Sequence, residues 1–217
     1  MQRPRMDSEP PPNCLICPRL ASFRADNRAA NPSWHNAPVA SFGPDDAPLL
    51  IVGLAPGLKG ANRTGRPFTG DFAGDLLYAT LLEFGLARGT YRAASDDGLE
   101  LIGCRITNAV RCVPPANKPT PAEIAACRSF LSATISDMPK LAVILALGRI
   151  AHDSVLSSLS VRRAAFPFGH GRVHEIQPGL SVHDSYHCSR YNTNTGVLTP
   201  DMFRDVVLAA RQRSQGR

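Results

Sequence analysis

A segment rich in glycine and proline carries two side chains that could act together on a ligand. It runs from Gly53 to Asp71 and reads GLAPGLKGANRTGRPFTGD. Such a backbone can turn tightly and approach a ligand closely. Phe68 offers an aromatic ring that can stack on a flat molecule, and Asp71 offers a carboxylate that can align a nucleophile. We therefore expect this segment to bind a flat ligand that is first stacked and then attacked.

Two later segments offer polar groups that could meet the same ligand. Asn108 lies in ITNAVRC, and its carboxamide can donate and accept hydrogen bonds side by side, which matches the Watson–Crick edge of a pyrimidine. His187 lies in YHCSRYNTNTG and could donate a hydrogen bond to a developing oxyanion. From position alone, Asn108 could equally cap a loop and His187 could equally be structural. We expect the five other histidines to be surface or packing residues.

Four of the six cysteines are spaced as metal ligands could be. Cys14 and Cys17 form a CxxC pair, and Cys112 and Cys127 form a wider pair around a proline-rich loop. Four thiolates from two distant segments can close one tetrahedral zinc site or hold one [4Fe–4S] cluster. The wide second spacing is less typical of zinc ribbons. The alternatives are that the cysteines are scattered in the core, or that Cys188 is the fourth ligand.

Composition limits the class of protein. The chain has 217 residues, of which 43 % are hydrophobic, and this fits one domain with a sizeable core. We expect residues 1–13, rich in proline, to be disordered and residues 14–217 to form the domain. No apolar run approaches the ~20 residues of a membrane span, and no secretory signal is evident. We therefore expect a cytoplasmic monomer without disulfides. The net charge of +6 favours an acidic partner, most simply nucleic acid.

The elements that must position these residues alternate along the chain. Apolar strands followed by helices predict an α/β fold, with one mostly parallel sheet covered by helices on both faces. Cys104, beside one of the apolar strands, is expected in the core, and residues 27–48 are expected to form a long loop. The predicted strands are 49–53, 105–110, 141–147 and 180–184, and the predicted helices are 72–86, 120–137, 148–159 and one that opens at 199–201.

These motifs together resemble the uracil-DNA glycosylase superfamily. GLAPG with GRPFTGD, ITNAVRC and the late histidine segment carry the resemblance, which extends from Cys14 to the last helix. The chain looks most like the family 5 branch, since Ala55 stands where other branches have a polar residue. The resemblance implies a hydrolase that flips uracil out of DNA and cleaves its N-glycosidic bond, leaving an abasic site. The small Ala55 side chain leaves room for hypoxanthine or other deaminated bases as further substrates.

The resemblance also implies roles for individual residues. Phe68 would stack on the flipped uracil, Asn108 would read its edge and His187 would stabilise the departing anion. Asp71 would orient water or balance the charge on the sugar. The pocket wall would be formed by Gly53, Ala55 and Gly57, and DNA would be contacted by Asn62, Arg63, Ser189, Arg190 and Asn194.

The resemblance implies a [4Fe–4S] cluster held by Cys14, Cys17, Cys112 and Cys127, with a structural role. One departure concerns the late motif, which in the family usually reads His-Pro-Ser-Pro and here reads HCSR. Arg190, in place of the second proline, could grip a phosphate or fill the gap left by the flipped base.

Two other kinds of function remain open from the sequence. The protein could bind nucleic acid on this fold without catalysis, or it could be an iron–sulfur redox sensor that reads DNA. Neither function would need Phe68, Asp71, Asn108 and His187 together, and for this reason we prefer the glycosylase.

Overall fold

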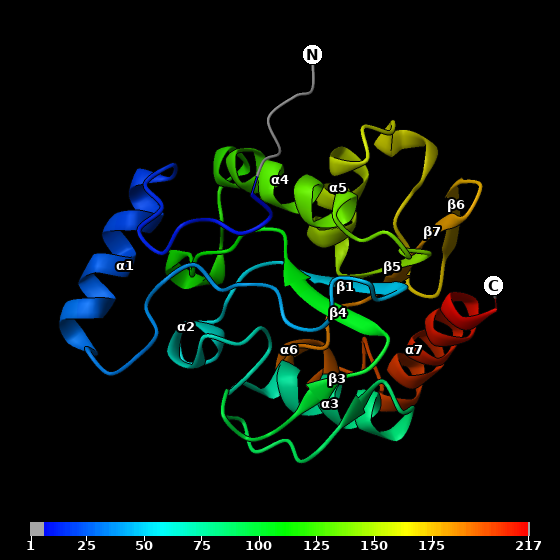
Figure 1. Ribbon diagram of the computed structural model, residues 1–217, viewed down its shortest axis with the longest axis horizontal. Helices are drawn as coiled ribbons and strands as arrows, with labels where there is room; N and C mark the ends of the chain where they lie inside the picture. Colours follow the sequence, from blue (N-terminus) through cyan, green and yellow to red (C-terminus); the bar gives the residue numbers. More distant parts are fainter. Residues whose placement is uncertain (1–6, 217) are drawn as a thin grey trace.

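The central feature of the computed structural model, which describes residues 7–216, is a five-stranded sheet between two layers of helices (Figure 1). The strand order is β4-β1-β5-β7-β6, and only β6 runs antiparallel to its neighbour. This confirms the α/β fold with a mostly parallel sheet. The strands are β1 (Leu49–Gly53), β4 (Cys104–Asn108), β5 (Val143–Leu147), β6 (Val173–Gln177) and β7 (Leu180–Ser185).

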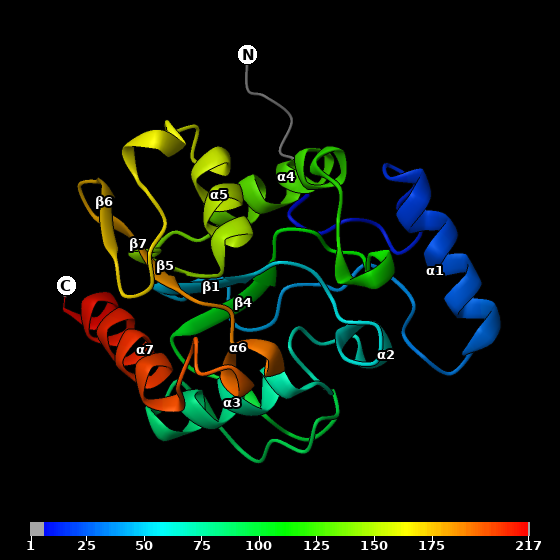
Figure 2. The same ribbon diagram turned by 180° about the vertical axis from the view of Figure 1, so that it is seen from behind.

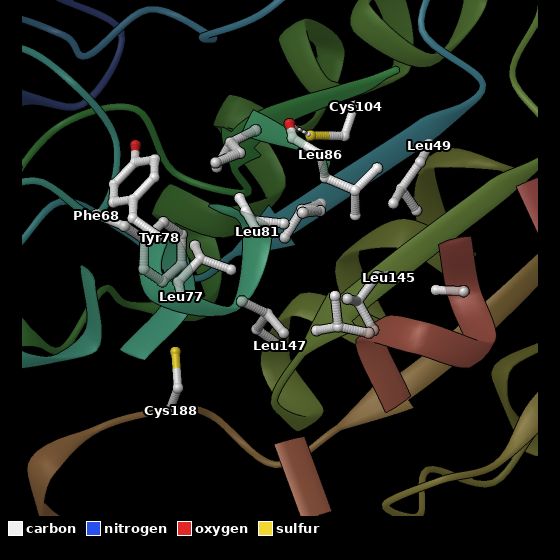
Figure 3. Close-up of a cluster of buried hydrophobic side chains, with 14 of the residues drawn as sticks. Leu49, Phe68, Leu77, Tyr78, Leu81, Leu86, Cys104, Leu145, Leu147 and Cys188 are labelled. Carbon is white, nitrogen blue, oxygen red and sulfur yellow. Dashed lines mark hydrogen bonds between the residues drawn. The ribbon is translucent and has the colours of Figure 1, made fainter. Parts of the chain in front are cut away.

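The alternation of side chains along each strand produces two separate cores. Leu49 and Ile51 of β1 join one buried cluster, whereas Leu50 and Val52 join the other, because successive side chains point to opposite faces of a sheet. All five residues of β1 are buried, as expected for a parallel strand covered on both sides. Figure 3 shows the first cluster, in which Leu77 and other side chains pack near the leucines of the sheet.

The helices cover both faces of the sheet, as the views from two sides show (Figures 1 and 2). Three of the longer helices begin at side chains that cap the first turn: Asp71, Thr120 and Thr199 each accept a hydrogen bond from a backbone N–H three residues on. Thr120 and Glu123 form the predicted capping box. On one face lie α4 (Pro121–Ser136) and α5 (Arg149–Ser158), and on the other lie α3 (Phe72–Glu83) and α7 (Pro200–Gln215).

The sequence prediction missed several elements. The helix α1 (Pro18–Ala30) overlaps the start of the segment 27–48 that we predict to be a loop, so this prediction is wrong over 27–30. Of its three buried residues two are polar, Arg24 and Asn27, and α1 therefore has no apolar stripe to reveal it. The edge strand β6 was missed as well. The other short elements are α2 (Ala61–Thr64), β2 (Ala87–Arg88), β3 (Glu100–Leu101), η1 (Pro115–Asn117), η2 (Arg163–Ala165) and α6 (Arg190–Asn194).

Contacts from the N-terminal segment reach the domain. Residues 1–6 of the predicted disordered tail lie outside the described residues. Further along, the Glu9 carboxylate accepts a hydrogen bond of 3.0 Å from Arg111, whose guanidinium also donates to Ser41 and Thr134. Arg111 is fully buried, so these partners satisfy a charge that water cannot reach. No helix among the described residues is long and apolar enough to cross a membrane.

Candidate active site and cysteine site

A pocket of about 490 Å³ lies at the carboxyl ends of β1 and β4. Gly53 and Asn108, the last residues of these strands, are register partners, and open α/β sheets place ligand sites at such strand ends. The pocket is lined by residues from the glycine-rich segment, β4 and the late histidine segment: Leu54, Ala55, Pro56, Gly57, Lys59, Ala61, Phe68, Gly70, Asp71, Phe72, Ala73, Asn108, Asn117, His187, Ser189 and Arg190. The structure thus brings Phe68, Asp71, Asn108 and His187 together.

Glycine at position 53 lets two pocket side chains approach the end of β1. A Cβ atom there would lie 2.5 Å from Asn108 Oδ1 and 2.5 Å from Phe68 Cζ. Gly53 is buried and does not line the pocket itself. Its lack of a side chain leaves the space behind the pocket wall that Asn108 and Phe68 occupy. The predicted neighbours Ala55 and Gly57 do line the pocket.

Phe68 has a backbone conformation that costs free energy. Its φ of +53° lies in the left-handed region, which a bulky residue rarely adopts. The chain around it is fixed from several sides. Tyr78 Oη donates a 2.6 Å hydrogen bond to the Pro67 carbonyl, and the buried guanidinium of Arg66 makes two 2.8 Å hydrogen bonds to Asp97. These buried contacts hold the ring of Phe68 in the pocket.

Asp71 both caps a helix and faces the pocket. Its Oδ1 accepts a 3.1 Å hydrogen bond from Gly74 N and so caps α3. Its Oδ2 lies against the backbone of Gly57 and Gly60, where a Cβ atom would collide with the carboxylate. Burial raises the pKa of Asp71, partly offset by the hydrogen bond from Gly74. The carboxylate therefore takes up a proton more readily than an exposed aspartate would.

His187 faces Phe68 across the pocket. The two rings are nearly parallel, with centroids 6.0 Å apart and an interplanar angle of 27°. Burial lowers the pKa of His187 to about 4, so its imidazole is neutral at neutral pH. The Asn192 side chain donates a 2.8 Å hydrogen bond to the His187 carbonyl and ties this segment to α6. A neutral imidazole in this place can donate one hydrogen bond without carrying a charge.

The residues predicted to contact DNA do not form one group. Asn62 is fully buried and donates a 2.9 Å hydrogen bond to Asn36 Oδ1, so the prediction that it contacts DNA is wrong. Ser189 lines the pocket and caps α6. Arg190 also lines it, with its guanidinium 5.4 Å from the centre of the Phe72 ring. Arg63 and Asn194, which are not among the pocket-lining residues, are exposed, and their contact with DNA stays a prediction.

Sequence reasoning missed Asn117, an exposed residue at the pocket that belongs to η1. Both Ala116 and Asn117 have positive φ angles. Asparagine tolerates this conformation better than most residues, and the PPAN sequence predicts a turn. The turn signal was readable, but its position depends on how the loop between Cys112 and Cys127 folds back toward the sheet.

The four predicted metal ligands line one recess beside α1 and α4, and we call them the cysteine site. Cys112 and Cys127 are buried, and Cys14 and Cys17 are partly exposed. All four are free thiols, and burial raises the pKa of Cys17, Cys112 and Cys127, the last to about 11. Free thiolates would thus be unstable here, and a bound cation would stabilise them.

The surroundings of these sulfurs test which metal group would fit. Arg24 donates a 2.9 Å hydrogen bond to Cys112 Sγ, and the backbone N–H of Arg111 donates to Cys127 Sγ at 3.4 Å. Hydrogen bonds of this kind support metal-bound thiolates. Four cysteine thiolates from two segments can hold one zinc ion or one [4Fe–4S] cluster, in which each sulfur binds a different iron.

Cys188 is not near the cysteine site. It is fully buried in the core under α3, where its Sγ donates a 3.4 Å hydrogen bond to the Ala73 carbonyl (Figure 3). This removes it as an alternative fourth ligand. Cys104 is buried in the same core, as predicted, and donates to the Leu86 carbonyl at 3.3 Å.

A second buried polar cluster joins α5, β6 and β7. Asp184 accepts hydrogen bonds of 2.7 Å from His152 Nδ1 and 3.0 Å from His174 Nε2. Because His152 Nε2 faces the Phe166 carbonyl at 2.8 Å, both nitrogens of this ring must carry protons. Although burial alone would lower the pKa of His152, the hydrogen bond and charge of Asp184 raise it overall. These distances are those of charge-assisted hydrogen bonds.

Comparison with known proteins agrees with this geometry. The model of the uracil DNA glycosylase superfamily matches residues 40–211, which include the whole pocket. The chain belongs to the uracil-DNA glycosylase superfamily. It is 44 % identical over 205 residues to a type-5 uracil-DNA glycosylase of Thermus thermophilus, covering 92 % of this chain and 93 % of that protein.

Two further members of the superfamily are less similar to this chain. A type-5 uracil-DNA glycosylase of Mycobacterium tuberculosis is 41 % identical over 210 residues, covering 92 % of this chain and 77 % of that protein. A type-4 uracil-DNA glycosylase of Archaeoglobus fulgidus is 31 % identical over 140 residues, covering 64 % and 62 %. The chain is thus more similar to these type-5 members than to the type-4 member, as the sequence motifs predict.

Proposed function

We propose that the protein is a DNA-repair hydrolase that cleaves the N-glycosidic bond between uracil and deoxyribose. The observation that carries this proposal is the convergence of Phe68, Asp71, Asn108 and His187 on one pocket. The type-5 and type-4 relatives bear the name uracil-DNA glycosylase, which supports the same reaction here. A base in a duplex is out of reach, so the nucleotide must be flipped into the pocket.

Recognition of the flipped base falls to Phe68 and Asn108. The Phe68 ring, fixed in place by its backbone, stacks on the base, and stacking is worth ~1–3 kcal/mol per base. The Asn108 carboxamide pairs with the base edge as donor and acceptor together. The pocket volume of about 490 Å³ and the small side chain of Ala55 leave space for a purine, so we also propose hypoxanthine as a substrate.

Bond cleavage separates charge, with a positive sugar and a negative base. His187 is neutral and can donate a hydrogen bond to the base oxygen on which negative charge develops. Asp71 as a carboxylate can align a water for attack at C1′ and offset the positive sugar. Since Ala55 offers no side chain to position water, this task falls on Asp71. The products are free uracil and an abasic site.

We also propose a [4Fe–4S] cluster on Cys14, Cys17, Cys112 and Cys127. Bound there, the cluster would supply cross-links between segments rather than a reaction step. The convergence of the four cysteines on one recess and the hydrogen bonds to two of their sulfurs support this assignment. The cluster would tie α1 to the loop that carries Asn117. We expect a cytoplasmic monomer.

The test is base release by the purified protein from oligonucleotides that contain uracil or hypoxanthine, both single- and double-stranded. The proposal expects release of free base and an alkali-labile abasic site without strand cleavage by the enzyme. Binding of uracil-containing DNA without any release would contradict it and favour a non-catalytic binder. Iron analysis of the same sample tests the cluster separately, with about four irons per chain expected.

A further inference from the structure

Three hollows adjoin one another along the surface beside His187. The active-site pocket shares Leu54 and His187 with a second hollow of about 280 Å³. The second hollow in turn shares Arg149 and Phe168 with a third, of about 530 Å³. A depression therefore leads from the active-site pocket, past His187, to the start of α5 and the loop that follows this helix.

The third hollow, which we call the arginine recess, is strongly cationic. Arg149, Arg162 and Arg163 are exposed, and the one carboxylate that lines the recess with them is Asp153. Within residues 7–216 none of these three arginines forms an ion pair, whereas Arg88, Arg204 and several others elsewhere are paired with carboxylates. The remaining lining residues are Ala164, Phe166, Pro167 and Phe168.

The hollow between the recess and the active-site pocket has a different character. It is lined by apolar and aromatic groups, including Ile150, Phe168 and Tyr186. Arg149 extends over the Phe168 ring at 5.3 Å and so marks the border with the arginine recess. Apolar and aromatic surfaces suit sugars and bases, and guanidinium groups suit phosphates. The lining of the depression thus changes from apolar to cationic along its length, which matches the sugars and bases and then the phosphates of a nucleic-acid strand.

We propose that the arginine recess binds phosphate groups of the DNA strand that carries the flipped nucleotide. This inference rests on the proposed glycosylase function, because it assumes that a nucleotide occupies the active-site pocket. The backbone of that nucleotide must continue out of the pocket, and the depression beside His187 offers it a path. The three unpaired guanidinium groups would replace the counterions of the phosphates that they meet.

The first experiment measures binding to duplex DNA with a stable abasic-site analogue as a function of salt. The variant Arg162→Gln/Arg163→Gln should lower the log–log salt slope by up to about two, because each phosphate that is no longer neutralised lowers it by about 0.9. Affinity at low salt should fall about ten-fold. The matched control is Arg88→Gln/Arg204→Gln, which removes two exposed charges outside the recess. Equal losses in both variants would overturn the proposal, since they would reflect net charge alone.

The second experiment shortens the DNA flank on one side of the abasic site and then on the other. For the wild type, trimming on one side only should weaken binding, and the recess variant should be insensitive to that trimming. If both flanks matter equally, or if the variant responds as the wild type does, the recess does not follow the strand.

Base release at saturating enzyme separates this proposal from the proposed function. The recess variant should release uracil at the wild-type single-turnover rate, because the recess residues do not meet the base. A large loss of this rate would contradict a purely binding role. If the wild type released no base but the binding results held, the proposed glycosylase function would be wrong. The assignment of the recess as a phosphate-binding site would still stand.

Discussion

The active-site pocket and the cysteine site differ in what holds them in place. In the pocket, protein contacts alone fix the geometry: Asp71 caps a helix, and Phe68 is held through Tyr78 and the neighbouring Arg66–Asp97 pair. In the cysteine site, buried thiols have raised pKa values and Arg24 Nε has no hydrogen-bond partner among the described residues. Protein contacts thus preorganise the pocket for its ligand, whereas the cysteine site would gain its stability from the proposed cluster.

The largest expected effect tests this difference at the cysteine site. Cys112→Ala should lose iron and most of the soluble protein, because it removes one of the four proposed ligands that would join α1 to the domain. Iron content and thermal unfolding of the purified variant measure the result. As a control, Cys188→Ala should keep full iron. A colourless wild type with one tightly bound zinc would contradict the cluster.

Within the pocket, Asp71→Ala should have the largest effect on catalysis. We expect single-turnover base release to slow by two or more orders of magnitude, about 3 kcal/mol or more of barrier. Iron content and DNA affinity should stay close to the wild type, which would show that the two sites fail independently. A near wild-type rate would instead place the catalytic burden on His187.

The pH profile of base release sharpens the account of the pocket. Because burial raises the pKa of Asp71, its carboxylate should be lost as pH falls through a value above the usual aspartate range, and the rate should fall with it. His187, with a pKa of about 4, is neutral above that pH. The residual rate of Asp71→Asn should therefore no longer fall at low pH, whereas the residual rate of His187→Gln should still fall. The opposite result would assign the fall in rate at low pH to His187 and not to Asp71.

A smaller effect is expected from Tyr78→Phe, which removes only the hydroxyl that holds the Pro67 carbonyl. Base release should slow about five-fold, since one buried hydrogen bond is worth about 1 kcal/mol and Phe68 then leaves its strained conformation more easily. In a Phe68→Ala background the same change should have no further effect on release. Additive losses would mean that Tyr78 acts on stability only.

The smallest effect concerns a region outside both sites. The folded-state pKa of His152 lies above its unfolded value, so its pairing with Asp184 stabilises the protein below the unfolded pKa. This stabilisation, on the order of 1 kcal/mol, should be lost as pH rises through the folded pKa. Urea unfolding at several pH values measures it, and Asp184→Asn should flatten the dependence. Iron content and base release should not follow the same curve.

The sequence predicted those elements whose formation depends on residues close to one another in the chain. Apolar runs identified β1 and β5, and the TPAE sequence identified the start of α4, because each signal lies within a few residues. The pocket group of Phe68, Asp71, Asn108 and His187 followed from motifs at strand ends. Helix α1 was missed because its burial depends on the cysteine site and not on an apolar face.

Errors in the site arose where folding decides which way a side chain points. Asn62 has the polarity of a DNA contact, but the short helix α2 turns it toward Asn36 and the interior. Asn117 was missed because the loop that begins at Cys112 brings it to the pocket. In both cases the deciding contact is with a segment distant in sequence, which residue type and spacing do not reveal.

The contacts of the N-terminal segment have a consequence for synthesis of the chain. Glu9 and Arg111 are 102 residues apart, and Arg24 and Cys112 are 88 apart. Cys14 and Cys17 therefore leave the ribosome long before Cys112 and Cys127, and contacts at such separation close slowly. During this interval α1 lacks the contacts that Arg19 makes with Glu123 and Arg24 makes with Cys112, and the thiols of Cys14 and Cys17 are open to other metals and oxidants. Delivery of iron and sulfide for the proposed cluster is thus expected only after α4 has been translated, as a late step that joins the N-terminal segment to the rest of the site.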